Sequence, residues 1–225
     1  MGERLKQWRD TERKKLRSLS GKEAIEYIWN YYKLWIIGIA FFLFITIFLA
    51  VRISNNIEGY WLYGIFANTM TEAGTGSELW EVFTDYAQLD LSQKKVEFNA
   101  SSYFDYLKDQ AKGNDYYNVF VALADAGILD FVTMEPASLE ALAQSGRLTD
   151  LRLERCKPLL ERYRDRVIWF HSAESGDIPV GFDISDSLLV TRYRLYPTGC
   201  ALGVAAHSEN LDNVALFLQF VLKEG

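Results

Sequence analysis

Apolar residues fill positions 34–51 without interruption, in the order LWIIGIAFFLFITIFLAV. The run carries no charge, and Thr46 is its only hydroxyl side chain. At 1.5 Å per residue the run makes a helix of about 27 Å, close to the hydrocarbon thickness of a bilayer. A buried core helix would show a polar stripe, and a secretory signal would have a short basic start and a small-residue cleavage site. The pattern therefore predicts an uncleaved transmembrane anchor.

A second pattern precedes this run. Ser20-Gly21-Lys22-Glu23 matches a capping box, and apolar residues then recur at helical spacing from Ala24 to Tyr32. A helix is therefore expected to begin at Gly21 and to continue into the span. Two alternatives stay open for the basic residues 1–19: they lie against an anionic inner leaflet, or they form a solvated arm.

Beyond the span, strand-like and helix-like patterns alternate. Strands are expected at 59–67, 95–100, 129–134, 167–170, 180–184 and 201–206, with a further one at 188–193. Helices are expected at 78–87, 104–112, 118–125, 136–144 and 211–223, the first capped by Ser77. The predicted fold class is α/β: a single N-terminal transmembrane helix followed by a mostly parallel sheet with helices on both faces.

The distribution of charge predicts orientation. Residues 1–52 hold ten Lys and Arg against five Asp and Glu, whereas residues 53–225 hold fourteen against twenty-five. The positive-inside bias gives a cytoplasmic arm and juxtamembrane helix at 1–33, a transmembrane helix at 34–51 and an extracytoplasmic domain at 52–225. A domain this acidic would repel phosphate, so no nucleic-acid partner is expected.

Several short stretches carry a resemblance. Residues 126–133 (AGILDFVT), 143–151 (AQSGRLTDL) and 201–210 (ALGVAAHSEN) resemble one lobe of a type II extracytoplasmic solute-binding protein. Residues 27–33 (YIWNYYK) are similar to the segment before the span in membrane-anchored Firmicutes proteins that carry such a domain outside. Only about fifty residues separate 151 from the closing strand, too few for a full second lobe. The resemblance thus implies a reduced, one-lobed relative.

Open α/β sheets bind ligands at the carboxyl ends of their parallel strands. Ordinary loop polar residues are the favoured interpretation of these positions, and if a ligand site is present it should be formed there. The candidate ligand-binding residues are Asn68, Thr69, Ser101, Ser102 and Glu135.

Motifs for catalysis and metal binding are missing from the sequence. It has no Gly-x-Ser-x-Gly, phosphate loop, His-Glu-x-x-His or Cys-x-x-Cys. His171 and His207 are its only histidines, and no spacing joins them to a zinc ligand set. Residues 183–187 (DISDS) imitate a calcium loop without its glycine and distal Glu, so a turn explains them better. We expect no catalytic residue, no metal and no cofactor.

Cys156 and Cys200 allow two interpretations. A disulfide between them would close a loop of about 45 residues and stabilise the fold by roughly 3 to 4 kcal/mol. Two free buried thiols are the favoured alternative, because a domain of this length builds a core without such a bond.

These patterns predict a non-enzymatic single-pass membrane protein that acts as an accessory, sensor or scaffolding subunit of a cell-envelope complex. Its expected partners are the lipid bilayer and another membrane protein, and the resemblance implies an ABC-type transporter. A membrane-tethered hydrolase, a genuine receptor for a small-molecule solute and a structural component assembled through the span are the alternatives.

Overall fold

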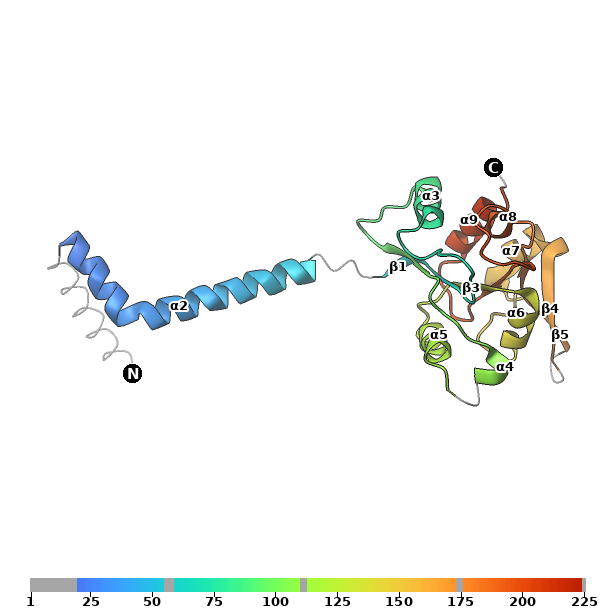
Figure 1. The fold of residues 1–225 in the computed structure, drawn as a ribbon, viewed down its shortest axis with the longest axis horizontal. Helices are drawn as coiled ribbons and strands as arrows, with labels where there is room; N and C mark the ends of the chain where they lie inside the picture. Colours follow the sequence, from blue (N-terminus) through green and yellow to red (C-terminus); the bar gives the residue numbers. More distant parts are fainter. Residues whose placement is uncertain (1–19, 55–58, 110–112, 173–175, 224–225) are drawn as a thin grey trace. The chain divides into compact units, whose positions relative to one another are not determined.

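The computed structural model describes residues 20–54, 59–109, 113–172 and 176–223, drawn as a ribbon in Figure 1. The chain divides into two compact units, Met1–Asn56 and Ile57–Gly225. The arm expected at residues 1–19 lies outside the described residues.

The first unit contains one long helix, α2 (Gly21–Ser54). It begins where the capping pattern predicts, because the backbone N–H and the hydroxyl of Ser20 both donate to the Glu23 carboxylate, at 3.0 and 2.9 Å. None of the residues Tyr32–Leu49 is buried, and this stretch is long and apolar enough to cross a membrane. The Thr46 hydroxyl donates to the carbonyl of Phe42 at 2.8 Å, so the helix satisfies this polar group internally.

The second unit is built on a six-stranded sheet. Its strands in chain order are β1 (Tyr60–Phe66), β2 (Lys95–Asn99), β3 (Phe131–Met134), β4 (Val167–Ser172), β5 (Gly176–Asp183) and β6 (Ala201–Val204). Their order across the sheet is β2-β1-β3-β6-β5-β4.

The sheet is mixed, which corrects the expectation of a mostly parallel one. β1 pairs with β2 and β3 in parallel, whereas the β3–β6, β6–β5 and β5–β4 pairs are antiparallel. The three residues between β4 and β5 are too few for a crossover, so these two strands form a hairpin. Helices separate β1 from β2 and β2 from β3 in the sequence, as parallel pairing requires.

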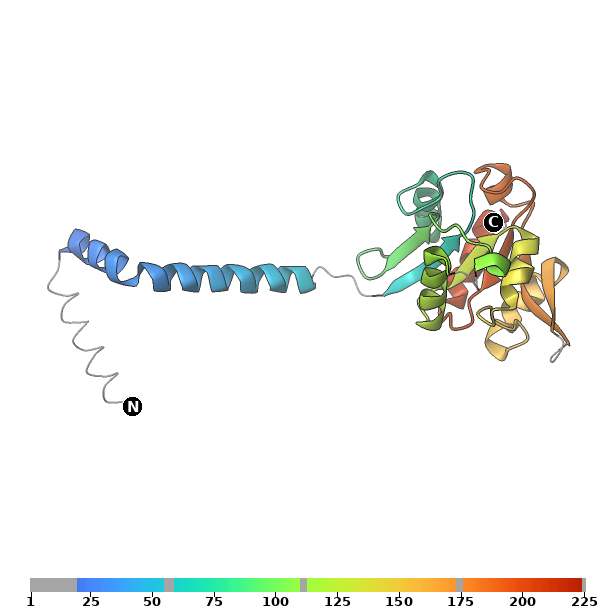
Figure 2. The same cartoon turned by 60° about the horizontal axis from the view of Figure 1, so that its bottom comes forward.

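Helices cover both faces of this sheet (Figures 1 and 2). Strand β1 shows why, because its side chains alternate between two apolar cores: Leu62 and Phe66 join one, and Ile65 joins the other. The first core includes buried residues of α3 (Glu78–Ala87), α7 (Lys157–Arg162), α8 (Leu188–Thr191) and α9 (Leu211–Val221). The second includes buried residues of α5 (Asp115–Asp125) and α6 (Pro136–Ala143), with α4 (Tyr106–Asp109) beside α6.

Capping side chains fix several helix starts. The Ser77 hydroxyl accepts the Trp80 N–H at 3.3 Å, so α3 begins as predicted. Helix α5 begins at Asp115 rather than 118, because the side-chain oxygen of Asn114 accepts the N–H groups of Tyr116 and Tyr117. The helix expected at 104–112 is described only as α4, with 110–112 outside the described residues.

One expected strand is wrong. Residues 188–193 contain the short helix α8, not a strand. Leu188 and Leu189 are consecutive, yet both belong to the same apolar core, which the alternation of a strand does not allow. The Thr191 hydroxyl donates to the Ser187 carbonyl at 2.9 Å, one helical turn back. No pattern at 154–166 predicted an element, yet the chain forms η1 (Glu154–Cys156), α7 and η2 (Arg164–Arg166) there.

Candidate functional site at the strand ends

One edge of the sheet collects the polar loops that follow its strands. The carboxyl ends of β1, β2 and β3 meet there because these strands are parallel. β5 is antiparallel to β6, which is antiparallel to β3, so the carboxyl end of β5 lies at the same edge. This edge therefore holds the predicted residues after β1, β2 and β3 together with the acidic turn after β5.

Asn68, at the end of β1, is hydrogen-bonded to the loop after β2. Its backbone is left-handed, with φ of 59°. Its side-chain oxygen accepts the Phe104 N–H at 3.0 Å, and its amide nitrogen donates to the Phe104 carbonyl at 2.8 Å. Its own backbone N–H donates to the Ser102 carbonyl at 2.9 Å. The amide of Asn68 is thus occupied in holding the protein together, and it aligns two loops at the strand ends.

Thr69 and Ser102 have the same kind of role. Both side chains are buried. The Thr69 hydroxyl donates to the Ala100 carbonyl at 3.3 Å, and the Ser102 hydroxyl donates to the side-chain oxygen of Asn99 at 3.3 Å. Ser101 differs, because it is exposed and lines an open hollow. The structure thus brings four predicted residues together. Asn68 and Ser101 are exposed, and of the four only Ser101 lines the hollow.

The hollow beside Ser101 has a volume of about 310 Å³. Two of its walls are tyrosines, Tyr103 and Tyr116, with 51% and 47% of their surface exposed. Their ring centroids are 6.2 Å apart and their planes cross at 78°. The Tyr103 hydroxyl donates to the Thr69 carbonyl at 3.3 Å, which fixes that ring. The complete lining is Met70, Thr71, Glu72, Gly74, Ala100, Ser101, Tyr103 and Tyr116.

Neither tyrosine is among the ligand-binding residues predicted from the sequence. Tyr103 directly follows two predicted residues, so its position after β2 was a signal that could have found it. Tyr116 gave no such signal, because it belongs to the first turn of α5, whose start was placed too late. Glu72 lies in the small-residue loop at 71–77 and is the acidic residue of the lining.

Glu135, the fifth predicted residue, does not line this hollow. It follows β3 and occupies the position before α6, where Pro136 provides the first turn. Its carboxylate accepts the Thr198 hydroxyl at 2.6 Å. Glu135 therefore joins the loop before β6 to the start of α6.

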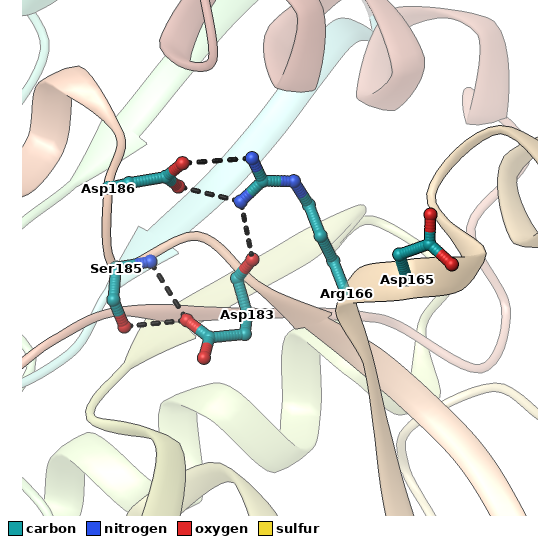
Figure 3. A pocket seen from close by; sticks show the side chains of 5 residues that line it. All are labelled: Asp165, Arg166, Asp183, Ser185 and Asp186. Carbon is teal, nitrogen blue, oxygen red and sulfur yellow. Dashed lines mark hydrogen bonds and ion pairs between the residues drawn. The ribbon is translucent and has the colours of Figure 1, made fainter.

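A second hollow, of about 500 Å³, lies at the same edge around Arg166 (Figure 3). The Arg166 guanidinium donates two hydrogen bonds to the Asp186 carboxylate, at 2.6 and 2.9 Å. This pairing lowers the pKa of Asp186. In Figure 3 the Asp165 carboxylate points away from that pair, and it lies 3.6 Å from Arg164. Arg166 and Asp186 are thus paired with each other, while the Asp183 carboxylate is bound by Ser185.

Asp183, the last residue of β5, and the residues after it form a turn. One oxygen of Asp183 accepts both the N–H and the hydroxyl of Ser185, at 2.9 and 2.6 Å. The Ser185 hydroxyl in turn accepts the Cys200 N–H at 3.1 Å. Among the described residues, no group of three or more His, Cys, Asp and Glu could hold a metal ion.

Asp130 is the one fully buried carboxylate of the described residues. It precedes β3, at the edge opposite the strand-end hollow. It accepts the Tyr63 N–H at 2.8 Å, the Ser208 hydroxyl at 2.7 Å and the Asn210 amide at 3.2 Å. Burial raises the pKa of Asp130, and these hydrogen bonds oppose the rise. A shifted buried carboxyl group is a catalytic candidate in general. Asp130, however, has no exposed surface, and its three hydrogen bonds connect β1 to the loop between β6 and α9, so its role is structural.

Histidine and cysteine are the other residue types of this domain with reactive side chains. His171 lies on the exposed hairpin, 2.8 Å from Asp177. Cys156 and Cys200 are both buried, free thiols, so the disulfide alternative is not formed. Burial raises the pKa of both thiols, which keeps them protonated and weakly nucleophilic.

No protein-family model matches this chain, and neither a curated protein nor a solved structure matches it.

Proposed function

We propose that this protein is a non-enzymatic, membrane-anchored recognition subunit, whose α/β domain binds a partner or ligand at the strand-end hollow. The observation that carries the proposal is the bare apolar surface of Tyr32–Leu49 on α2. An exposed apolar patch on a soluble protein rarely exceeds a few hundred Å². A helix that is apolar all around over this length is stable when lipid surrounds it.

The charge distribution supports one orientation of the anchor. The basic residues before the span favour a cytoplasmic N-terminus, so we place the α/β domain outside the cell membrane. In this position the protein would act as an accessory, sensor or scaffolding subunit of a cell-envelope complex. The resemblance at 126–151 supports a relation to a solute-binding lobe. It also makes an ABC-type transporter the partner that we propose.

A recognition role is favoured by the way the strand-end residues are used. Asn68, Thr69 and Ser102 hold the two loops in place, and the surface they support presents aromatic rings. Rigid loops with exposed tyrosines suit binding, because a tyrosine offers a large contact area at a low cost in side-chain entropy. A genuine solute receptor is the second candidate, favoured by the hollow itself.

Topology can be tested directly. Protease added to intact cells or protoplasts should digest the α/β domain and spare the N-terminal arm, both detected with terminal tags. The same digestion after detergent lysis is the control, because both tags should then become accessible. Protection of the α/β domain in intact cells would overturn the orientation, and recovery of the whole chain in the soluble fraction would overturn the anchor.

A further inference from the structure

The two tyrosines of the strand-end hollow form a corner. Their planes cross at 78° with centroids 6.2 Å apart, so a face of each ring is available to one small group in the angle between them. The Met70 side chain, 71% exposed, is a third apolar wall. A cation is attracted to an aromatic face within about 6 Å of the ring centroid, and a corner of two rings adds both attractions.

Charge at this hollow has one sign. Glu72 is a wall of the hollow, and none of the described lining residues is basic. The start of α5 lies beside Tyr116, but its first N–H groups are already bound by Asn114, at 2.9 and 3.3 Å. An anion would find no cationic side chain among these walls, whereas a cation would find a carboxylate and two ring faces.

The lining also favours a cation without N–H groups. A primary ammonium has three donors to satisfy. The Thr71 and Tyr103 hydroxyls donate to backbone carbonyls, at 3.0 and 3.3 Å, and keep lone pairs that can accept from such a donor. The two ring faces and the Met70 thioether, in contrast, provide apolar surface that only the alkyl groups of a cation can cover. An alkylated ammonium needs only such surface and a nearby negative charge.

We propose that the strand-end hollow binds a small alkylated ammonium cation against Tyr103 and Tyr116, with Glu72 as the countercharge. This inference rests on the proposed recognition function and names the ligand class of the same site. A volume of about 310 Å³ suits a compact ligand of this kind. The cation can come from a free solute or from a lipid headgroup.

The test uses the full chain in nanodiscs of phosphatidylglycerol, whose headgroups contain no ammonium. Choline chloride is titrated by saturation-transfer NMR, and 3,3-dimethyl-1-butanol, its neutral isostere, is the matched ligand. We expect saturable transfer to the choline methyl protons and binding of the isostere that is weaker by about fivefold or more. Glycerophosphocholine is the second arm: tighter binding than choline assigns the site to a headgroup, and weaker binding assigns it to a free solute.

Variants locate the binding. Tyr103→Leu and Tyr116→Leu should each weaken choline binding by about two- to fivefold, because each removes one ring face. Tyr103→Phe keeps the face and should keep the affinity, which separates the ring from the hydroxyl contact with Thr69. Glu72→Gln should weaken binding and reduce its salt dependence. Tyr86→Leu and Glu81→Gln, two exposed positions on α3, are the matched controls and should change nothing.

Three results would overturn the cation site: no saturable transfer from any ammonium ligand, equal binding of choline and its neutral isostere, or unchanged binding in both tyrosine-to-leucine variants. Membrane anchoring is scored separately, by whether the chain enters the nanodisc before any ligand is added. If it stays in the buffer, the titration is run on the same chain there. Failure of the anchor and failure of the cation site are thus distinguishable.

Discussion

The Phe131 ring lies directly over Gly64, its partner in the adjacent parallel strand. A Cβ placed on Gly64 would be 2.2 Å from the ring, closer than any real contact. The ring stacks in turn on Phe217 of α9, with centroids 4.6 Å apart and planes 20° from parallel. The missing side chain of Gly64 therefore leaves room for the Phe131 ring over β1, and α9 packs on that ring through Phe217.

Gly64→Ala should lower the free energy of unfolding by about 1 to 3 kcal/mol, because the new methyl group overfills the space beneath Phe131. Urea unfolding of the α/β domain measures the change. Phe131→Leu provides the matched test, because its smaller side chain makes room for the methyl group. The double variant should lose less stability than the two single losses added together. Simple additivity would mean that the two residues do not compete for space.

Asp130 joins three parts of the fold. It lies directly before β3, and its donors come from β1 and from the loop between β6 and α9. Asp130→Ala would leave those donors buried without an acceptor. We expect a loss of roughly 3 to 5 kcal/mol in unfolding free energy. Asp177→Ala is the matched control, since this carboxylate is exposed on the β4–β5 hairpin, and the change there should cost under about 1 kcal/mol. Equal losses at the two positions would contradict the structural role of Asp130.

The raised pKa of Asp130 also predicts a pH dependence. The folded protein binds this proton more tightly than the unfolded chain, whose Asp pKa is about 3.9. The resulting stabilisation is complete below the unfolded pKa and is lost as the pH rises through the folded pKa. Unfolding free energies measured across this range should therefore fall less steeply with rising pH in Asp130→Asn than in the wild type.

Asp186 provides the control of opposite sign. Arg166 lowers its pKa, so its contribution is present above the unfolded pKa and is lost as the pH falls through the folded pKa. The pair is largely exposed, so this contribution is small. Between pH 5 and pH 7, Asp186→Asn should not change the slope of the unfolding free energy against pH. This range begins roughly one unit above the unfolded pKa of an Asp, so Asp186 is already ionised in both states. A slope altered equally by both variants would show that Asp130 is not the titrating group.

Elements with a strong local signal could be predicted from the sequence. Strand β1 is an apolar run bounded by glycine and small polar residues, and α3 combines Ser77 with helical periodicity. The apolar run before 52 predicted a single long helix, and α2 contains it. These signals depend on neighbours in the chain, so they do not require knowledge of the tertiary fold.

What was missed depends on contacts between distant residues. The direction of β6 is set by its pairing with β3 and β5, which no local pattern records. The residues after β1, β2 and β3 lie at one edge because these strands are parallel, but the amide of Asn68 bonds to the backbone of Phe104, a contact that spacing does not record. Tyr116 lies against Tyr103 at the start of α5, where the Asn114 amide donates to the Tyr103 carbonyl at 3.1 Å, so the aromatic corner could not be predicted from spacing.

The last prediction concerns the bare helix α2. Phe42 lies near the middle of Tyr32–Leu49 and is 69% exposed in the chain alone. If lipid surrounds this stretch, Phe42→Arg places a charge near the bilayer centre, at a cost of about 2.5 to 3.5 kcal/mol. The membrane-bound fraction that resists carbonate extraction should then fall sharply.

Two variants of the same helix separate charge from other effects. Phe42→Leu keeps an apolar side chain and should leave the extraction-resistant fraction unchanged. Ile25→Arg adds the same charge outside Tyr32–Leu49, where the side chain is 70% exposed, and should have little effect because the position meets water or headgroups. If all three variants fractionate like the wild type, lipid does not surround Phe42. The apolar surface of α2 would then need a protein partner, since water cannot stabilise a helix that is apolar on every side.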